Sequence, residues 1–563
     1  MIKGFLGTRF RGPLAAGLLS IAVLVGIVSQ PLEASAAPSS VAPVDSSLQA
    51  TLSSQFLGCD PAGSTVSPAT AQALSLVLPE AFTTNAAGVV VQASSFLQQA
   101  EVQSLNPLVV AYSILPNARW IDGRTIGLAD FLATWKWGVK GSGPAVGQYR
   151  SILSIKKATV PHQVLVQFKQ PTNSWRALFS PLLPATTPFQ ALAGCSTPDA
   201  ALDLSGGPYV IASSSPSAMV LIKNPRWWGA PAPFSTLVLS GEINPTVDQF
   251  VGTDNYGIAE ANWLPSQVIA SIASSPGVSS HGDVSNQIVS LDFNTNAKGA
   301  VTLPLRRALA ALINRPALVT QNVSPVNPEI APAASHLFSQ GQPGYVGPTA
   351  KSIATAVTTT TMPLRPSPEL QTASRLLHKA GYQRVEGHWS TRTGKVLVVS
   401  LAVPFDDRWA ATSASAIKTQ LAAQGIQVRM TIVANSEAAA ASLRSNRVMT
   451  AIIVRPSDLY LAHSAAWFTT SPGVAPVALW AGYQNRALNR LAMQAEQNMN
   501  PTDALPLYQQ IDASLWNAMP SLPLFTEPSL LAWSTAVDGV AMNPFPPGTL
   551  SALLTWKLSQ PTP

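Results

Sequence analysis

The chain has 563 residues, enough for two or three domains that each bury a sizeable core. Its formal net charge is +7, but only 11% of its residues are charged, whereas soluble domains carry about 25%. No Lys/Arg run occurs beyond the N-terminal segment, which argues against nucleic-acid binding. A surface with few carboxylates changes little in charge on acidification, so we expect a protein that tolerates an acidic exterior.

The first segment has the pattern of an export signal. Basic residues precede the apolar run at residues 13–28, and small residues follow it. This order predicts a signal peptide over residues 1–37, with cleavage near Ala36 or Ala37. A retained membrane anchor is the alternative, because the apolar run approaches the length of about 20 residues that spans a bilayer. In either case we expect an exported, extracytoplasmic protein, periplasmic or associated with the cell envelope.

Residues 38–50 are rich in Pro, Ser and Ala and are predicted to form a disordered linker. No cysteine directly follows the apolar run, so the position for a lipid anchor is missing there. The chain contains only Cys59 and Cys195. An even number of cysteines in an exported chain favours one disulfide, and two buried thiols are the alternative.

Short apolar stretches alternate with turn residues up to about residue 290, which predicts strands with helices between them. The strand candidates are VVAYSIL, QVLVQF, PYVIAS, AMVLIK and STLVLS. An amphipathic helix is expected just after the Asp122-Gly123 turn, because apolar residues recur there at helical spacing. This apolar stripe consists of Leu128, Phe131, Leu132 and Trp135.

Residues 291–524 are richer in long helices. One helix is predicted from a second apolar stripe, which consists of Leu305, Ala308, Leu309, Leu312 and Ile313. Another is predicted to begin at Ser367 and Pro368 and to end at Gly381, because Pro favours the first turn and Gly the end of a helix.

Several longer segments, which follow one another in a fixed order over nearly the whole mature chain, can be compared with the motifs of known families. They include ARWIDGRTIGLADFLATW, GGPYVIASSSPSAMVLIKNPRWWG, SLDFNTNAKGAVTLPLRRALAALINRPALV and LYQQIDASLWNAMPSLPLFTEPSLLAWS. These segments resemble the extracytoplasmic solute-binding proteins of ABC importers, in particular the peptide- and nickel-binding family 5. The segments VLPEAFTTNAAGVVVQASSFL and VVAYSILPNARW resemble actinobacterial members of that family. By this resemblance Trp120, Asp122 and Gly123 belong to the scaffold.

The resemblance implies an α/β fold of the large, type II periplasmic-binding-protein kind. Two lobes are then joined by a hinge of two crossing strands, with the ligand enclosed between the lobes. Lobe I would comprise residues 45–290 and 525–563, and lobe II residues 291–524. The hinge strands would contain Phe293 and Asn294 on one crossing, and Pro523, Leu524 and Phe525 on the other.

The resemblance also implies ligand contacts. Family members that bind peptides hold the amino terminus with an aspartate three residues after a tryptophan in lobe II. Asp458 falls at the acidic position here, but Arg455 stands in place of the tryptophan. Arg455 is therefore expected either to contact a carboxylate or phosphate of the ligand or to pair with Asp458. Trp263, Trp409 and Asn294 are further candidates for ligand contact, and burial in the core is the alternative for both tryptophans.

We predict a monomer that delivers an oligopeptide-like or other polar organic ligand to the membrane permease subunits of an ABC importer. The same fold acting as a regulator of lipid or glycan assembly in the cell envelope is the alternative. An exported serine hydrolase is a remote third reading, because Ser154 with Lys157 and Ser415 with Lys418 fit a Ser-x-x-Lys pattern. We predict no catalytic residue, metal ligand or cofactor, since the companion motifs are incomplete and the six histidines are scattered.

Overall fold

The computed structural model describes residues 46–60, 66–85, 89–141, 145–187, 205–241, 256–296, 298–347, 368–469 and 483–558. The predicted signal peptide, residues 38–45 of the predicted linker, and Cys195 lie outside these residues. Within the described ranges, no helix combines the length and apolar character needed to cross a membrane.

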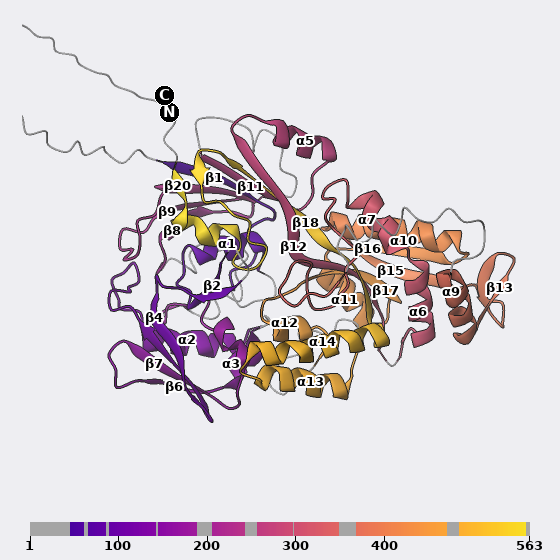
Figure 1. Ribbon diagram of the computed structural model, residues 1–563, viewed down its shortest axis with the longest axis horizontal. Coiled ribbons are helices and arrows are strands. Elements are labelled where there is room, and N and C mark those ends of the chain that lie inside the picture. The colour runs from indigo at the N-terminus through magenta and orange to yellow at the C-terminus, as the bar shows by residue number, and fades with distance from the viewer. Residues whose placement is uncertain are drawn as a thin grey trace, which may run out of the picture. The chain divides into compact units, whose positions relative to one another are not determined.

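A ten-stranded mixed sheet is the largest element of the structure (Figure 1). Its strands are β1 (Ser47–Leu52), β8 (Tyr209–Ser214), β9 (Ala218–Lys223), β10 (Thr236–Gly241), β11 (Tyr256–Ala261), β12 (Val278–Phe293), β15 (Val398–Pro404), β16 (Gln427–Val433), β17 (Thr450–Pro456) and β18 (Ser521–Ser534). They follow the order β16-β15-β17-β12-β18-β11-β1-β10-β9-β8. The long antiparallel strands β12 and β18 therefore connect the two ends of the sheet.

Two large hydrophobic clusters lie at the two ends of this sheet. The first is built from residues 48–258 and 531–556, and the second from residues 284–525. We call the parts around them lobe I and lobe II. The predicted hinge residues Phe293, Leu524 and Phe525 are buried inside the second cluster. The pairing of β12 with β18 is irregular between Val284 and Ser290. Near this stretch, the buried residues of the two strands change from the first hydrophobic cluster to the second. The predicted lobe boundaries at residues 290 and 524 stay a prediction.

Lobe I also contains a four-stranded sheet in the order β4-β5-β7-β6. Its strands are β4 (Leu97–Leu105), β5 (Leu108–Ile114), β6 (Ile152–Lys157) and β7 (Gln163–Phe168), with the hairpin β2 (Phe82–Thr84) and β3 (Val90–Gln92) nearby in sequence. Its helices are α1 (Pro68–Ser75), α2 (Leu128–Gly138), α3 (Val146–Ser151) and α5 (Ser266–Ser274), with short 3-10 turns η1 (Asn173–Ala177) and η4 (Thr549–Thr555). The strands β19 (Val537–Asp538) and β20 (Lys557–Leu558) form a short pair. All five predicted strands of this region are confirmed, as β5 and β7 to β10.

Lobe II is the more helical part. Its helices are α6 (Leu303–Leu312), α7 (Arg315–Asn322), α9 (Pro368–Lys379), α10 (Arg408–Ala423), α11 (Ser436–Arg444), α12 (Leu461–Ala465), α13 (Arg486–Gln497) and α14 (Pro501–Ala518), with the hairpin β13 (Tyr382–Val385) and β14 (His388–Thr391). The predicted stripe on α6 is confirmed, since all five of its residues are buried. Asn314 ends this stripe and caps α7, where its side chain accepts a hydrogen bond from the Ala317 amide at 2.9 Å.

Two expectations about local structure need correction. Residues 47–50, expected to be disordered linker, belong to β1, where Leu48 and Ala50 are buried between β10 and β11. The apolar stripe of α2 is also rotated from the predicted one, because Asp130 and Thr134 are fully buried. Polar side chains can occupy a buried face when they have hydrogen-bond partners, which a hydropathy pattern does not reveal.

Cys59 is buried and disulfide-bonded. Its predicted partner, Cys195, lies outside the described residues, so the pairing of Cys59 with Cys195 stays a prediction.

Candidate functional site

Arg455 lies on β17 in a buried ion pair. One guanidinium nitrogen donates to Asp292 on β12 at 2.5 Å, and the other donates to the hydroxyls of Ser290 and Ser521 at 2.9 and 3.3 Å. Arg455 is 3% exposed. The expected pair with Asp458 is therefore wrong, because strand pairing brings Asp292 to the same face as Arg455. Ligand contact by Arg455 stays a prediction, and these contacts favour a structural role.

Three other residues were predicted to contact the ligand. Asn294 is buried, and its amide donates to oxygens of the segment before β17 at 3.0 and 3.4 Å. Trp409 is also buried, and its indole donates to the Asn262 carbonyl at 3.0 Å. Trp263 is half-buried, with the Arg408 guanidinium carbon 3.4 Å from its ring centre. Ligand contact by these residues stays a prediction, and only Trp263 has appreciable exposed surface.

Asp458 follows β17 and interacts with the start of α12. Its carboxylate accepts from the Tyr460 amide at 2.9 Å and from Nδ1 of His463 at 2.8 Å. Because Nδ1 donates here, Nε2 of a neutral His463 ring is an acceptor. That Nε2 atom is buried and has no hydrogen-bond partner among the described residues. A buried ring nitrogen that can still accept a hydrogen bond can bind a donor group of a solute or a water molecule.

Tyr460, which is next to Asp458 in space, is close enough to lobe I for charged groups there to influence its pKa. Burial raises the pKa of Tyr460, and the charge of Asp458 raises it further; among smaller influences on this pKa, Arg176 lowers it and Glu80 raises it. Glu80 follows α1 and Arg176 lies in η1, so both belong to lobe I. We call the side chains that are linked by these hydrogen bonds, or by their charge effect on Tyr460, the junction cluster: Glu80, Arg176, Asp458, Tyr460 and His463.

Sequence reasoning found only Asp458 of this cluster. Glu80 had a usable signal, because it is the one carboxylate in the otherwise apolar and neutral stretch at residues 74–82. Burial raises the pKa of Glu80 to about 8, so this carboxyl is mostly protonated at neutral pH. Arg176, Tyr460 and His463 gave no comparable signal, since their roles depend on contacts between distant segments.

Beside the junction cluster, hydrogen bonds join η1 of lobe I to the end of α13 in lobe II. Glu496 accepts from the hydroxyls of Thr172 and Ser174, the latter at 2.9 Å. The Asn173 amide donates to two backbone carbonyls at the end of α13, at 2.8 and 3.1 Å. We call these contacts of Thr172, Asn173 and Ser174 with the end of α13 the interlobe clasp. It holds the lobes together through the protein's own groups.

Removing the clasp is expected to open the lobes. The variant Thr172→Val/Ser174→Ala leaves the half-buried Glu496 carboxylate without two donors, and each hydrogen bond to a charged group contributes about 1.5–3 kcal/mol. We expect the population of open molecules to rise at least tenfold, measured as a larger radius of gyration by small-angle X-ray scattering. The control is Thr419→Val on α10, whose hydroxyl bonds only within its own helix. Identical scattering from the double variant and the control would contradict this assignment.

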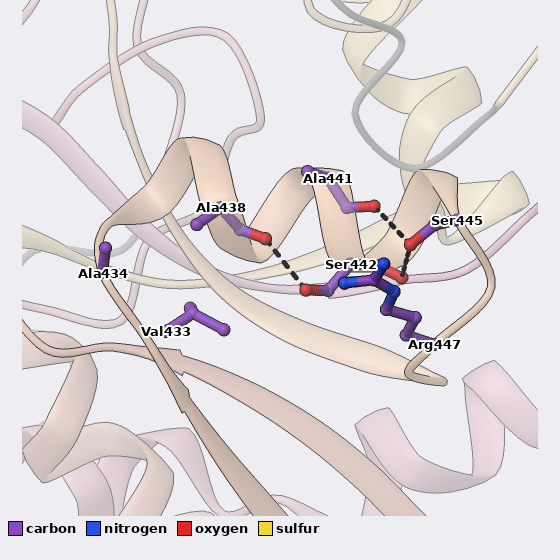
Figure 2. A pocket seen from close by; sticks show the side chains of 7 residues that line it. All are labelled: Val433, Ala434, Ala438, Ala441, Ser442, Ser445 and Arg447. Atoms are coloured by element: carbon purple, nitrogen blue, oxygen red, sulfur yellow. Dashed lines mark hydrogen bonds between the residues drawn. The ribbon is translucent and has the colours of Figure 1, made fainter.

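A surface groove lies elsewhere, beside α11 (Figure 2). It has a volume of about 410 Å³ and is lined by Val433, Ala434, Ala438, Ala441, Ser442, Ser445 and Arg447. The hydroxyls of Ser442 and Ser445 donate to carbonyls of their own helix at 2.9 and 2.8 Å. A groove with one charged side chain and committed hydroxyls lacks the converging polar groups of a solute site.

Neither Ser-x-x-Lys pair of the remote hydrolase reading lies in an enclosed site. Ser154 and Lys157 are three residues apart on β6, so their side chains leave opposite faces of the strand. Ser415 and Lys418 are both exposed on α10. In the described ranges, no group of three or more His, Cys, Asp or Glu residues could hold a metal ion.

Comparisons with known proteins identify the family and the fold of this chain. Residues 95–474, more than half of the chain, match the model of the bacterial extracellular solute-binding proteins, family 5 Middle. LpqW of Mycobacterium tuberculosis, a probable monoacyl phosphatidylinositol tetramannoside-binding protein, is 25% identical over 64% of this chain and 60% of its own length. The oligopeptide-binding protein OppA of Mycobacterium bovis is 28% identical over 48% of this chain and 47% of its own length. The chain thus spans less than two thirds of these relatives.

Solved structures share the fold. The periplasmic EDTA-binding protein EppA superposes with a TM-score of 0.77 over 92% of this chain and 97% of that one, at 19% identity. AppA of Bacillus subtilis, in complex with a nonapeptide, superposes with a TM-score of 0.70 over 91% and 99% of the two chains, at 15% identity. The predicted two-lobed α/β fold of the periplasmic-binding-protein kind is confirmed. The chain belongs to the bacterial extracellular solute-binding proteins of family 5.

Proposed function

We propose that the protein captures an oligopeptide-like or other polar organic solute between its lobes and delivers it to the permease of an ABC importer. The observation that carries this proposal is the junction cluster. Its His463 in lobe II has a buried Nε2 atom with no hydrogen-bond partner among the described residues, and its half-buried Glu80 in lobe I lines a cavity. Polar groups with remaining hydrogen-bonding capacity on both lobes are typical of a solute site.

Two lobes that share one sheet can enclose a solute without catalysing a reaction. A solute that bonds to both lobes stabilises the closed form, and it shifts the opening equilibrium by its difference in affinity for the two forms. The closed form is what a permease would recognise. We accordingly propose that the protein is not an enzyme, acts outside the cytoplasm as a monomer, and has no cofactor.

The solute is expected to offer both hydrogen-bond donors and acceptors. Peptides meet this requirement, and the relatives include an oligopeptide-binding protein and a structure with a bound nonapeptide. Recognition of an amino terminus by Asp458 would proceed differently from the pattern expected for the family, because Asp458 already accepts from His463 and from the Tyr460 amide. An arriving amino group would have to share or displace the His463 contact.

Native mass spectrometry of the purified exported protein, before and after a denaturing wash, tests this function. We expect a defined polar mass or a peptide series that the wash releases, and at least a tenfold lower occupancy in Asp458→Asn. Asp503→Asn on α14, an exposed aspartate, is the matched control and should retain the solute. A mass that stays unshifted after incubation with peptide and sugar libraries would contradict the proposal.

A second function is favoured by one comparison. The match to LpqW covers more of this chain than the match to OppA, and LpqW is described as binding a mannosylated lipid. The alternative is therefore a regulator of envelope lipid or glycan assembly on the same fold. Release of a glycolipid mass in the native measurement would support this function over peptide import.

A further inference from the structure

A small cavity in lobe I lies directly beside the junction cluster. Its volume is about 80 Å³, and it is lined by Glu80 together with residues that include Phe96, Gly207, Trp227, Trp228 and Leu554. A water molecule needs about 10–15 Å³ by the same measure, so the cavity accommodates several waters or one compact organic group. Because Glu80 also belongs to the junction cluster, the cavity adjoins the proposed solute site.

Glu80 is half-buried, and it differs from three other buried or half-buried carboxyls of the protein. Asp130 accepts three hydrogen bonds, Glu260 accepts one from Gln72 at 2.7 Å, and Glu496 accepts from the clasp hydroxyls. Glu80 has no such donor among the described residues, and burial is the one resolved influence on its pKa, which it raises to about 8. The fold therefore keeps a carboxyl at this cavity without supplying the group that would stabilise its charge.

The aromatic wall of the cavity offers ring surface and no ring donor. The centres of the Trp227 and Trp228 rings are 4.7 Å apart. The indole nitrogen of Trp227 donates to the Ala230 carbonyl at 2.8 Å, and that of Trp228 donates to the Ser95 carbonyl at 2.7 Å. Since both N–H groups are committed, neither indole offers a donor to a ligand, and the face of an indole ring attracts cations.

The polar wall is also dominated by acceptors. The hydroxyls of Ser75 and Ser551 donate to backbone carbonyls at 2.7 and 2.6 Å, which leaves their lone pairs for a ligand. The amides of Gly206 and Gly207 donate to the Val77 carbonyl at 3.1 and 2.8 Å. Of the polar groups at the cavity, the Thr83 and Ser95 hydroxyls can still either donate or accept.

We propose that this cavity binds a compact ammonium group of the solute held between the lobes. The proposal rests on the proposed function and adds to it the chemical class of one end of the solute. An ammonium group supplies several donors and a positive charge, which the Glu80 carboxylate, the hydroxyl lone pairs and the indole faces all accept. An anionic group would instead meet a carboxyl and oriented lone pairs. Binding displaces the proton of Glu80 to solvent.

Titration of the purified exported protein with ethylammonium chloride, followed by NMR, tests this assignment. Ethanol is the neutral probe of similar size. At pH 8.5 we expect ethylammonium to bind at least tenfold more tightly than ethanol. Because a carboxyl with a pKa of about 8 must lose its proton, binding at pH 6.5 should be about 25-fold weaker, while the probe stays charged at both pH values.

Matched variants separate Glu80 from general charge effects. Glu80→Gln keeps the shape of the side chain and should lose the preference for ethylammonium and its pH dependence. Glu101→Gln, at an exposed carboxylate on β4, should behave as the wild type. Should Glu80→Gln fold poorly, the carboxyl carbon of Glu80 in the wild type can be followed directly, and ethylammonium should lower its titration midpoint. Equal binding of ethanol, or an unchanged midpoint, would overturn the assignment.

The outcome is distinguishable from that of the solute measurement. A solute that co-purifies with the protein while ethylammonium shows no dependence on Glu80 would refute the ammonium pocket and leave solute capture intact. Glu80-dependent binding of ethylammonium by a protein that never retains a solute would support the pocket and contradict the proposed function.

Discussion

Replacing Arg455 with methionine is expected to destabilise the protein by about 3–5 kcal/mol. The change leaves Asp292 as an unpaired charge in a site where its side chain is 2% exposed. It also removes donors from the hydroxyls of Ser290 and Ser521. The energetic effect comes mainly from the uncompensated carboxylate, because a buried pair contributes little net free energy while either single partner is costly.

Chemical denaturation measures this effect. The double variant Arg455→Met/Asp292→Leu should recover most of the lost free energy of unfolding, since apolar residues of similar volume can replace a buried pair. Arg444→Met is the control, because Arg444 pairs with Glu437 at 3.5 Å on the surface and should cost less than about 1 kcal/mol. Similar midpoints for Arg455→Met and Arg444→Met would show that the buried pair has no such role.

The protein is expected to be more stable at pH 5.5 than at pH 8.5. Glu527 on β18 is buried, and its pKa is raised first by burial and then by the charge and hydrogen bond of Asp407. The pKa of Glu80 is raised to about 8 by burial. Between the ordinary carboxyl pKa of 4.5 and these raised values, the folded protein binds more protons than the unfolded chain. Stability therefore falls as pH rises through this window.

Thermal melts across this pH range test whether stability falls or rises with increasing pH. Both groups should contribute to the fall in stability with rising pH, because both pKa values are raised in the folded protein. Glu527→Gln cannot ionise, so it should flatten the profile and raise stability at pH 8.5, whereas Glu101→Gln should leave the profile unchanged. A melting temperature that rises from pH 5.5 to pH 8.5 would contradict the raised pKa values. The expected profile also fits the acid tolerance inferred from the low content of charged residues.

The strands and helices were predictable because their hydrophobic periods are local. The α6 stripe and the strands β7 and β9 follow directly from spacing. The stripe of α2 was misplaced because Asp130 is buried against donors from Trp120 and from two backbone amides, including that of Ala185, 55 residues away. Buried polar contacts of this kind have no local signature.

The site was less predictable than the fold for the same reason. The partner of Arg455 is 163 residues away, on a strand whose register cannot be obtained from spacing. The Asp458 position followed from family resemblance, but its contact with His463 depends on how the chain turns into α12. Glu80 and Arg176 influence the pKa of Tyr460 only because two distant parts of the chain are close in the fold. Local sequence patterns do not describe such proximity.

The continuous sheet also limits how the lobes can move. β12 and β18 are hydrogen-bonded to each other along most of their length, so the two chain crossings cannot swivel independently. Twisting one lobe about the strand axis would shear the ladder, whereas bending at the irregular pairing near Val284 and Ile288 preserves most hydrogen bonds. The motion is thereby reduced to nearly one coordinate, and a distance measured between any two points on opposite lobes should report the same opening rate.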